Sequence, residues 1–188
     1  MVQFSYILDL IPLSKFWGTL YMRIKEYKAM KNITKCLICD RINEIKEGKN
    51  SCFVVELSSG YVVFGDHQFY KGYALFLSRI HANELHDLDR EIKENFLREM
   101  SIVAEAVFRV FQPIKMNYEL LGNKDSHMHW HLYPRHVDDP DINRPIWSYP
   151  KDKRCNRATE VDESFTETYK PLLKKQIETL LKSQGKKV

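Results

Sequence analysis

The sequence predicts an α+β fold, in which an antiparallel sheet packs against a long helix and a C-terminal helix. Short apolar runs separated by turns rich in Gly, Ser, Asn and Asp indicate hairpin strands. Residues 89–110 repeat apolar side chains with the period of a helix, and residues 161–181 do so again. Strands and helices do not alternate along the chain, so the sheet is expected to be antiparallel.

The predicted strands begin after a largely polar stretch, residues 36–50, which contains a turn at Gly48–Asn50. Pro113 ends the long helix because proline lacks a backbone donor. Pro134 marks the end of the last strand for the same reason. The predicted strands are Cys52–Leu57, Tyr61–Phe64, Gly72–Leu77, Met116–Leu121 and His127–Tyr133.

Length and composition indicate one globular domain with an extension at each end. The chain has 188 residues, of which 44% are hydrophobic and 12% aromatic. Its net charge of +4 does not favour a nucleic-acid polymer as a partner. We expect an N-terminal extension of unknown role at residues 1–30, the domain at 31–150, and a C-terminal extension with a helix at 151–188. Met30 is an alternative start of the chain, because the residues that follow it begin the expected domain.

The N-terminal residues do not have the pattern of a secretory signal. Their apolar part is short, is interrupted by Asp9 and Pro12, and has no basic region before it. No apolar run reaches the roughly 18 residues of a membrane span, so no membrane partner is expected. Without a secretory signal, the cysteines of the chain are not expected to form a disulfide framework, and a cytoplasmic location follows.

The stretch HMHWHLYPR, residues 127–135, holds three of the seven histidines of the chain. Side chains of a strand alternate between its two faces, so His127, His129 and His131 would share one face. The residues between them are apolar and would cover the other face. An imidazole has an ordinary pKa near 6.5, so it is largely neutral and nucleophilic at neutral pH. Three imidazoles in register therefore indicate phosphate or metal chemistry.

Residues 116–123 together with the histidine stretch resemble the histidine triad (HIT) family, whose signature is His, apolar, His, apolar, His and two apolar residues. The resemblance extends from about Cys36 to Arg135 and is to bacterial-type HIT hydrolases such as diadenosine tetraphosphate hydrolases. It implies a HIT-like fold for the domain at 31–150. It also implies a nucleotide hydrolase or nucleotidyl transferase that attacks the α-phosphate of a dinucleoside polyphosphate or nucleoside phosphoramidate. His129, the middle histidine, would form a covalent nucleotidyl-histidine.

The same resemblance implies roles for other residues. His131 would contact the phosphate and orient His129, and His127 would support both. A homodimer paired through the long helix and its neighbouring strand is implied as well. Family positions that bind nucleotide or phosphate fall on Asn117, Asn123 and Asp66.

A structural zinc site is implied by a set of four residues, namely Cys36, Cys39, His81 and His127. In related proteins a C-x-x-C pair, a histidine after the central strand and the first triad histidine hold the ion. Two thiolates and two imidazoles suit tetrahedral Zn²⁺. His86 is a rival to His81, which we prefer because it directly follows the end of a strand.

Tyr73 stands where many family members have a fourth histidine. A phenol donates a hydrogen bond but does not do the work of a neutral imidazole. An alternative function is therefore kept open, a nucleotide-sensing or interaction protein with little turnover. Past the triad, Arg135 is a candidate for a polyphosphate contact or a surface position, and Trp147 is expected in packing or against a base. A solvated loop is expected for Lys151, Lys153 and Arg154.

Overall fold

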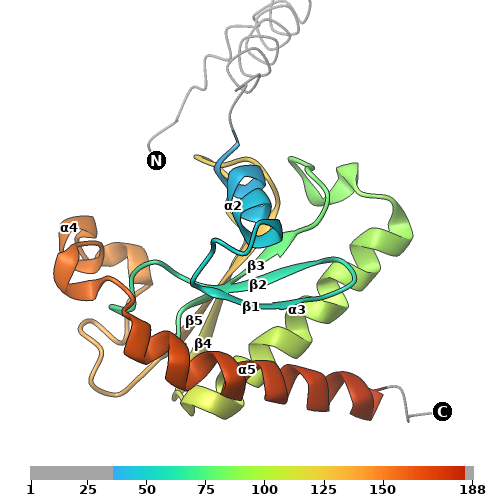
Figure 1. The fold of residues 1–188 in the computed structure, drawn as a ribbon. Helices are drawn as coiled ribbons and strands as arrows, with labels where there is room; N and C mark the ends of the chain where they lie inside the picture. The colour runs from blue at the N-terminus through green and yellow to red at the C-terminus, as the bar shows by residue number, and fades with distance from the viewer. Residues whose placement is uncertain (1–35, 185–188) are drawn as a thin grey trace, which may run out of the picture. The chain divides into compact units, whose positions relative to one another are not determined.

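A five-stranded antiparallel sheet forms the centre of the fold, with the strands in the order β1-β2-β3-β5-β4 (Figure 1). The predicted α+β class is confirmed. The computed structural model describes residues 36–184, so the expectations for residues 1–30 and for Met30 lie outside the described residues. The strands are β1 (Phe53–Glu56), β2 (Gly60–Phe64), β3 (Ala74–Ser78), β4 (Lys115–Glu119) and β5 (His129–Arg135). The helices are α2 (Leu37–Lys46), α3 (Arg90–Phe111), α4 (Lys151–Arg154) and α5 (Glu163–Gln184).

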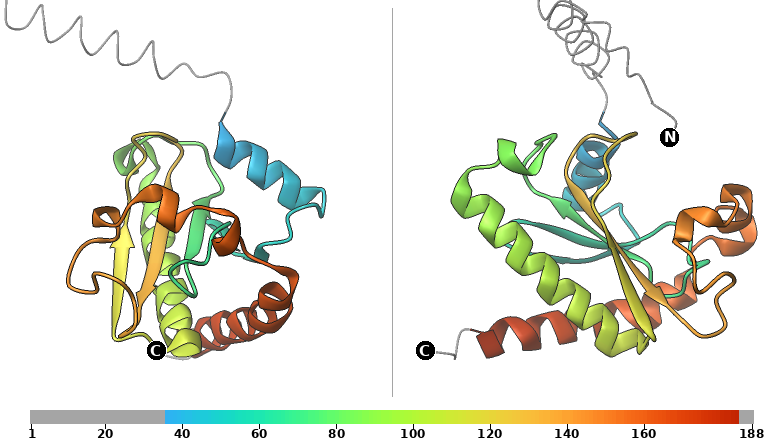
Figure 2. Two further views of the ribbon diagram at one scale, coloured as in Figure 1. Left: turned by 90° about the vertical axis from the view of Figure 1, so that its left-hand side faces the viewer. Right: turned by 180° about the vertical axis from the view of Figure 1, so that it is seen from behind.

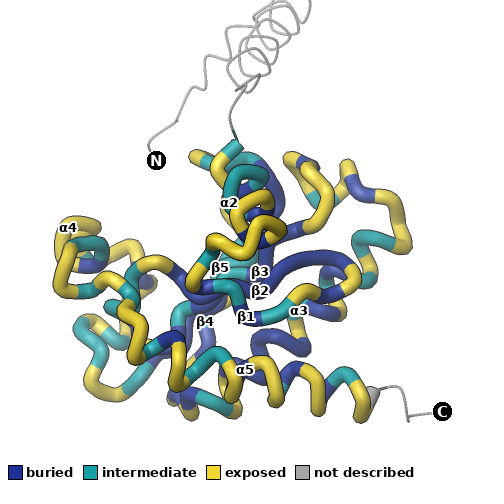
Figure 3. The backbone as a smooth tube through the Cα atoms, in the orientation of Figure 1, coloured by how far each residue is buried: buried dark blue, intermediate teal, exposed yellow. Residues whose placement is uncertain are grey.

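The two long helices α3 and α5 pack against each other beneath the sheet (Figure 2). Their positions confirm the helical periods of the sequence. Phe76 of β3 stacks on Phe96 of α3, with ring centres 5.0 Å apart. Trp130 pairs with Phe76 across the sheet and shares this apolar face. Strands β2, β3 and β5 are largely buried, whereas α5 exposes one side to solvent (Figure 3).

Helix α2 was not predicted from the sequence, which showed only a polar stretch there. Ile38, Ile42 and Ile45 are spaced at helical intervals and are the buried residues of α2. Cys36 caps the helix, since its sulfur accepts a hydrogen bond from the Cys39 backbone N–H at 3.4 Å. Three apolar positions among ten residues are too few for a strong periodic signal, although they suffice to pack the helix on the domain.

The prediction that Pro134 ends the last strand is wrong, because β5 runs from His129 to Arg135. The Arg135 carbonyl accepts a hydrogen bond from Ile114 at 2.9 Å, so the backbone of Arg135 faces the β4 side. Backbone polar groups alternate along a strand, so the nitrogen of Pro134 faces the β3 side. Pairing with β3 ends at Leu132, so no neighbouring strand requires an N–H at Pro134.

Strand β4 is an edge strand of the sheet. Exposed apolar side chains lie on β4 and on the segments next to it in the sequence. Tyr118 on β4, Ile114 before it and Phe108 on α3 are each about half exposed or more. This is the region that the expected homodimer would use, and the dimer stays a prediction. Within residues 36–184, no helix has both the length and the apolar character needed to span a membrane.

Candidate functional site

His129 lies at the start of β5, in the interior of the sheet, and only 6% of it is exposed. Its Nδ1 lies 2.6 Å from the backbone carbonyl of His127. A carbonyl oxygen only accepts hydrogen bonds, so Nδ1 of His129 must carry the proton. The other ring nitrogen, Nε2, therefore keeps a free lone pair in the neutral imidazole.

His131 follows on the same face of β5, with its ring centre 4.7 Å from that of His129. Its Nδ1 lies 2.6 Å from the hydroxyl oxygen of Tyr73. Burial lowers the pKa of His131 to about 3 and raises that of Tyr73, so both groups are neutral at neutral pH. The phenol is the better donor and the imidazole nitrogen the better acceptor. Tyr73 therefore donates to Nδ1, and the Nε2–H of His131 remains available to an anion.

Tyr73 is held in place from two sides. Its ring stacks on Tyr133 at a centre-to-centre distance of 4.0 Å. A Cβ atom at Gly65 would lie 2.1 Å from the Tyr73 ring, so only glycine fits there. The tyrosine that replaces the expected histidine is thus built into the site as the partner of His131.

A cavity of about 240 Å³ opens over His129 and His131. Leu37 and Ile38 of α2 line it, as do Leu75 and Leu77 of β3. Polar and aromatic residues from the segment after β5 complete the lining, namely Trp147, Lys151, Arg154 and Cys155. A mostly apolar hollow with a few polar groups beside two imidazoles has the character of a small-molecule site.

The three expected nucleotide-binding residues are not gathered in this cavity. Asp66 lines it, but its carboxylate is held by both terminal nitrogens of Arg41 from α2. Asn117 accepts a hydrogen bond from Arg135 at 3.2 Å and does not line the cavity. Asn123 is exposed in the loop between β4 and β5 and does not line it either. Nucleotide contacts by these three residues stay a prediction.

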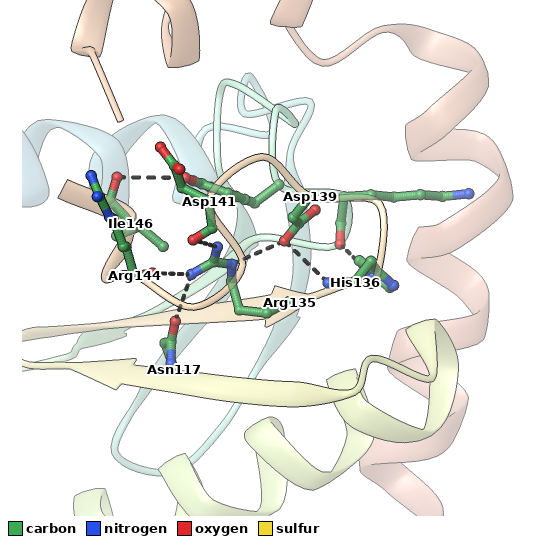
Figure 4. A network of polar contacts seen from close by, with 9 residues as sticks. Asn117, Arg135, His136, Asp139, Asp141, Arg144 and Ile146 are labelled. Atoms are coloured by element: carbon green, nitrogen blue, oxygen red, sulfur yellow. Dashed lines mark hydrogen bonds and ion pairs between the residues drawn. The ribbon is translucent and has the colours of Figure 1, made fainter. Parts of the chain in front are cut away.

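Arg135 is a structural residue and not an anion ligand at the surface, because its guanidinium lies in a network of polar contacts (Figure 4). Only 2% of the residue is exposed. It forms an ion pair with Asp139 at 2.9 Å. It also donates to Asn117 and to the backbone carbonyls of Asp141 and Arg144. These contacts tie the segment after β5 to the sheet, and that segment forms one wall of the cavity.

His127 precedes β5, and its ring lies outside the cavity, so the expected row of three imidazoles is a row of two. Its Nε2 lies 2.8 Å from the carbonyl of Ser78 and must carry the proton. The unprotonated Nδ1 faces the sulfur atoms of Cys36 and Cys39, at 3.6 and 3.4 Å. The Cys39 sulfur lies 3.3 Å from Nδ1 of His81.

The four expected metal ligands thus form one cluster, in which the donor atoms lie within 4.8 Å of one another. Tetrahedral zinc with ordinary bond lengths separates its sulfur and nitrogen ligands by about 3.5 Å, which matches these contacts. Burial and the neighbouring Cys36 raise the pKa of the Cys39 thiol to about 11. A divalent cation reverses that penalty because it stabilises the thiolate. The donor set and its geometry therefore fit zinc, and the rival His86 is not part of the cluster.

Two parts of the cavity wall were missed by sequence analysis. Helix α2 supplies Arg41, which no motif marked. Arg154 was expected in a solvated loop, but it is only 8% exposed and lines the cavity, so that expectation is wrong. Lys151 lines the cavity as well, and Lys153 is exposed as expected. The cluster of aromatic and basic residues at 147–154 was the sequence feature that could have indicated a binding site. Only the tertiary structure places it beside the histidines.

The fold and the site together define a histidine triad protein, with two imidazoles in a cavity and the first histidine in a cysteine–histidine cluster. Residues 46–138 match the model of the HIT domain, and the chain belongs to the HIT family. A search of curated proteins finds no match.

Solved structures show the same fold at low sequence identity. A histidine triad protein from Marinobacter aquaeolei is 22% identical with a TM-score of 0.59, covering 68% of this chain and 89% of that one. A hypothetical histidine triad nucleotide-binding protein from Sulfolobus tokodaii is 18% identical with a TM-score of 0.60, covering 80% and 97%. A zinc-bound histidine triad family protein from Mycobacterium smegmatis is 17% identical with a TM-score of 0.54, covering 80% and 98%.

The buried environment of His131 predicts a pH dependence. The unfolded chain binds a proton at the ordinary pKa of about 6.5, and the folded protein binds it at about 3. Between these values the unfolded state holds more protons, so the stability that His131 contributes is lost as the pH falls through this window. An NMR titration of the His131 ring should show a neutral imidazole in the folded protein down to about pH 4. Titration near the ordinary value in the folded protein would contradict the assigned burial.

Proposed function

We propose that this protein is a nucleotide hydrolase or nucleotidyl transferase that attacks the α-phosphate of a nucleotide derivative through His129. The observation that carries the proposal is the free Nε2 of His129, fixed by the His127 carbonyl, beside the Nε2–H of His131 in one cavity. A nucleophile and a hydrogen-bond donor for the phosphate are thereby placed side by side. Family membership supports the general class, nucleotide hydrolysis or transfer.

The reaction has two displacement steps. The Nε2 lone pair of His129 forms a bond to phosphorus, while the bond from phosphorus to the leaving group breaks and its electron pair stays on the leaving atom. Water then forms a bond to the same phosphorus, the N–P bond returns its electrons to Nε2, and the water proton passes to solvent. His131 donates to a phosphate oxygen in both steps, because its neutral ring keeps the Nε2–H.

Dinucleoside polyphosphates and nucleoside phosphoramidates are the substrate classes that we propose. The apolar part of the cavity suits a nucleoside. The similar protein from Sulfolobus tokodaii is described as nucleotide-binding, which supports a nucleotide here.

Replacing the nucleophile tests this proposal. Wild-type protein incubated with an adenosine nucleotide that has a good leaving group should carry AMP on the peptide containing His129. His129→Ala should lose both the adduct and turnover, because the attacking Nε2 is removed together with the ring. Quenched samples analysed by mass spectrometry measure the adduct.

His86→Ala is the matched control, since His86 is an exposed histidine outside the cavity and should leave the adduct unchanged. A wild-type protein that binds nucleotide but forms no adduct and shows no turnover would contradict the proposal. That outcome would favour the alternative, a nucleotide-sensing or interaction protein. The ion pair between Arg41 and Asp66 is the feature that favours this alternative, because it occupies the carboxylate at the cavity rim.

We propose further that Cys36, Cys39, His81 and His127 hold a structural zinc ion. A full set of four protein ligands leaves no open position, so zinc would supply structure and not a reactive water. The ion would fix the start of α2 against the residues that precede β5. The similar protein from Mycobacterium smegmatis is described as zinc-bound, which supports the assignment.

Removing a ligand tests the zinc proposal. Purified wild-type protein should contain an equimolar amount of zinc by elemental mass spectrometry. Cys39→Ser should lose the metal and unfold at a lower temperature, because the apolar face of α2 is then held without the ion. Cys155→Ser is the control, since Cys155 lies outside the cluster and should leave the zinc content unchanged. Full zinc content in Cys39→Ser would contradict the assigned ligands.

A further inference from the structure

The side chain of Arg154 is fixed beside the cavity by the segment that follows β5. Its Nε donates to the carbonyl of Tyr149 at 2.9 Å. Its guanidinium carbon lies 4.9 Å from the ring centre of Trp147. Only 8% of the residue is exposed, so the charge is largely removed from water.

This buried charge has no ion pair among the residues that the structure describes. The other two arginines near the site each have a carboxylate partner, Asp66 for Arg41 and Asp139 for Arg135. Glu119 of β4 is an acidic neighbour that Arg154 influences, but the two form no ion pair within 4.0 Å. A buried guanidinium without a directly paired carboxylate is costly, so a site of this kind favours an anion.

Arg154 shares the cavity with the two catalytic candidates. The Trp147 ring connects them, since its centre lies 6.4 Å from that of His131 and its face contacts Arg154. Neither terminal nitrogen of Arg154 takes part in the hydrogen bond to Tyr149, and the two together form the planar fork that matches two phosphate oxygens. Lys151, one helical turn earlier, adds a second positive charge to the same wall.

We propose that Arg154 binds a second phosphate group of the substrate, adjacent to the phosphate that His129 attacks. This inference rests on the proposed function and narrows its substrate class. Nucleoside diphosphates and longer polyphosphates, including dinucleoside polyphosphates, place a further phosphate beside the reacting one. Phosphoramidates of nucleoside monophosphates do not, so they would leave the charge of Arg154 without a partner.

Binding of two ligands that differ by one phosphate tests the inference. AMP and α,β-methylene-ADP are titrated into the full-length wild-type chain by calorimetry, since the methylene bridge prevents cleavage. The second phosphate should improve affinity by about tenfold or more, as expected for charge-assisted hydrogen bonds. Arg154→Gln should abolish that difference between the two ligands. Lys153→Gln, which removes an exposed charge of the same helix outside the cavity, should retain it.

Equal affinity of wild-type protein for the two ligands would overturn the inference, and so would a difference that persists in Arg154→Gln. Arg154→Lys provides a second test if the glutamine variant does not fold. It keeps the charge but loses the fork and should retain only part of the difference, whereas the full difference would contradict a role for the guanidinium. Failure of the proposed reaction is distinguishable, because absence of a His129 adduct leaves the binding difference intact.

Discussion

His127 connects the two parts of the site, and the rest of the arrangement depends on how this one residue is held. Its ring donates to the Ser78 carbonyl and turns Nδ1 toward the two cysteines. Its own carbonyl accepts from Nδ1 of His129 and thereby frees the opposite nitrogen. The same residue therefore contacts the cysteine–histidine cluster and fixes the position of the ring proton of His129, the proposed nucleophile. In the proposed reaction, a histidine that lies outside the cavity thereby acts on the nucleophile inside it.

Helix α2 extends that connection to the cavity wall. The cluster holds the first turn of the helix, where Cys36 and Cys39 lie, and the following residues Leu37, Ile38 and Arg41 line the cavity. A zinc ion bound there would couple metal content to the shape of the ligand site. On the other side, the buried Arg135 holds the segment that carries Trp147 and Arg154. The cysteine–histidine cluster and Arg135 thus each hold one wall of the cavity in place, and these walls set the shape of the ligand site around His129 and His131.

Local patterns in the sequence predicted the strands, α3, α5 and the alternation of His129 with apolar residues, because burial on one face leaves a periodic trace. Helix α2 was missed because only three of its residues, all isoleucines, face the domain, and three apolar positions in a polar stretch give too weak a helical period. The burial of Arg135 and Arg154 was missed for a different reason. Each depends on contacts within the irregular segment after β5, such as the one between Arg154 and the Tyr149 carbonyl, and such contacts leave no periodic signal. The resemblance to the HIT family indicated the four proposed metal ligands. Periodicity could not have brought them together, because Cys36 and His127 are some ninety residues apart in the sequence.

The His127 carbonyl keeps the proton on Nδ1 of His129 and leaves Nε2 unprotonated, and the proposed chemistry depends on this. Nitrogen-15 NMR of the imidazole side chains measures this directly, because protonated and unprotonated ring nitrogens differ widely in chemical shift. The account predicts the proton on Nδ1 of His129 and an unprotonated Nε2. A neutral ring with the proton on Nε2 would contradict it, since the nitrogen that faces the phosphate would then have no lone pair to attack with.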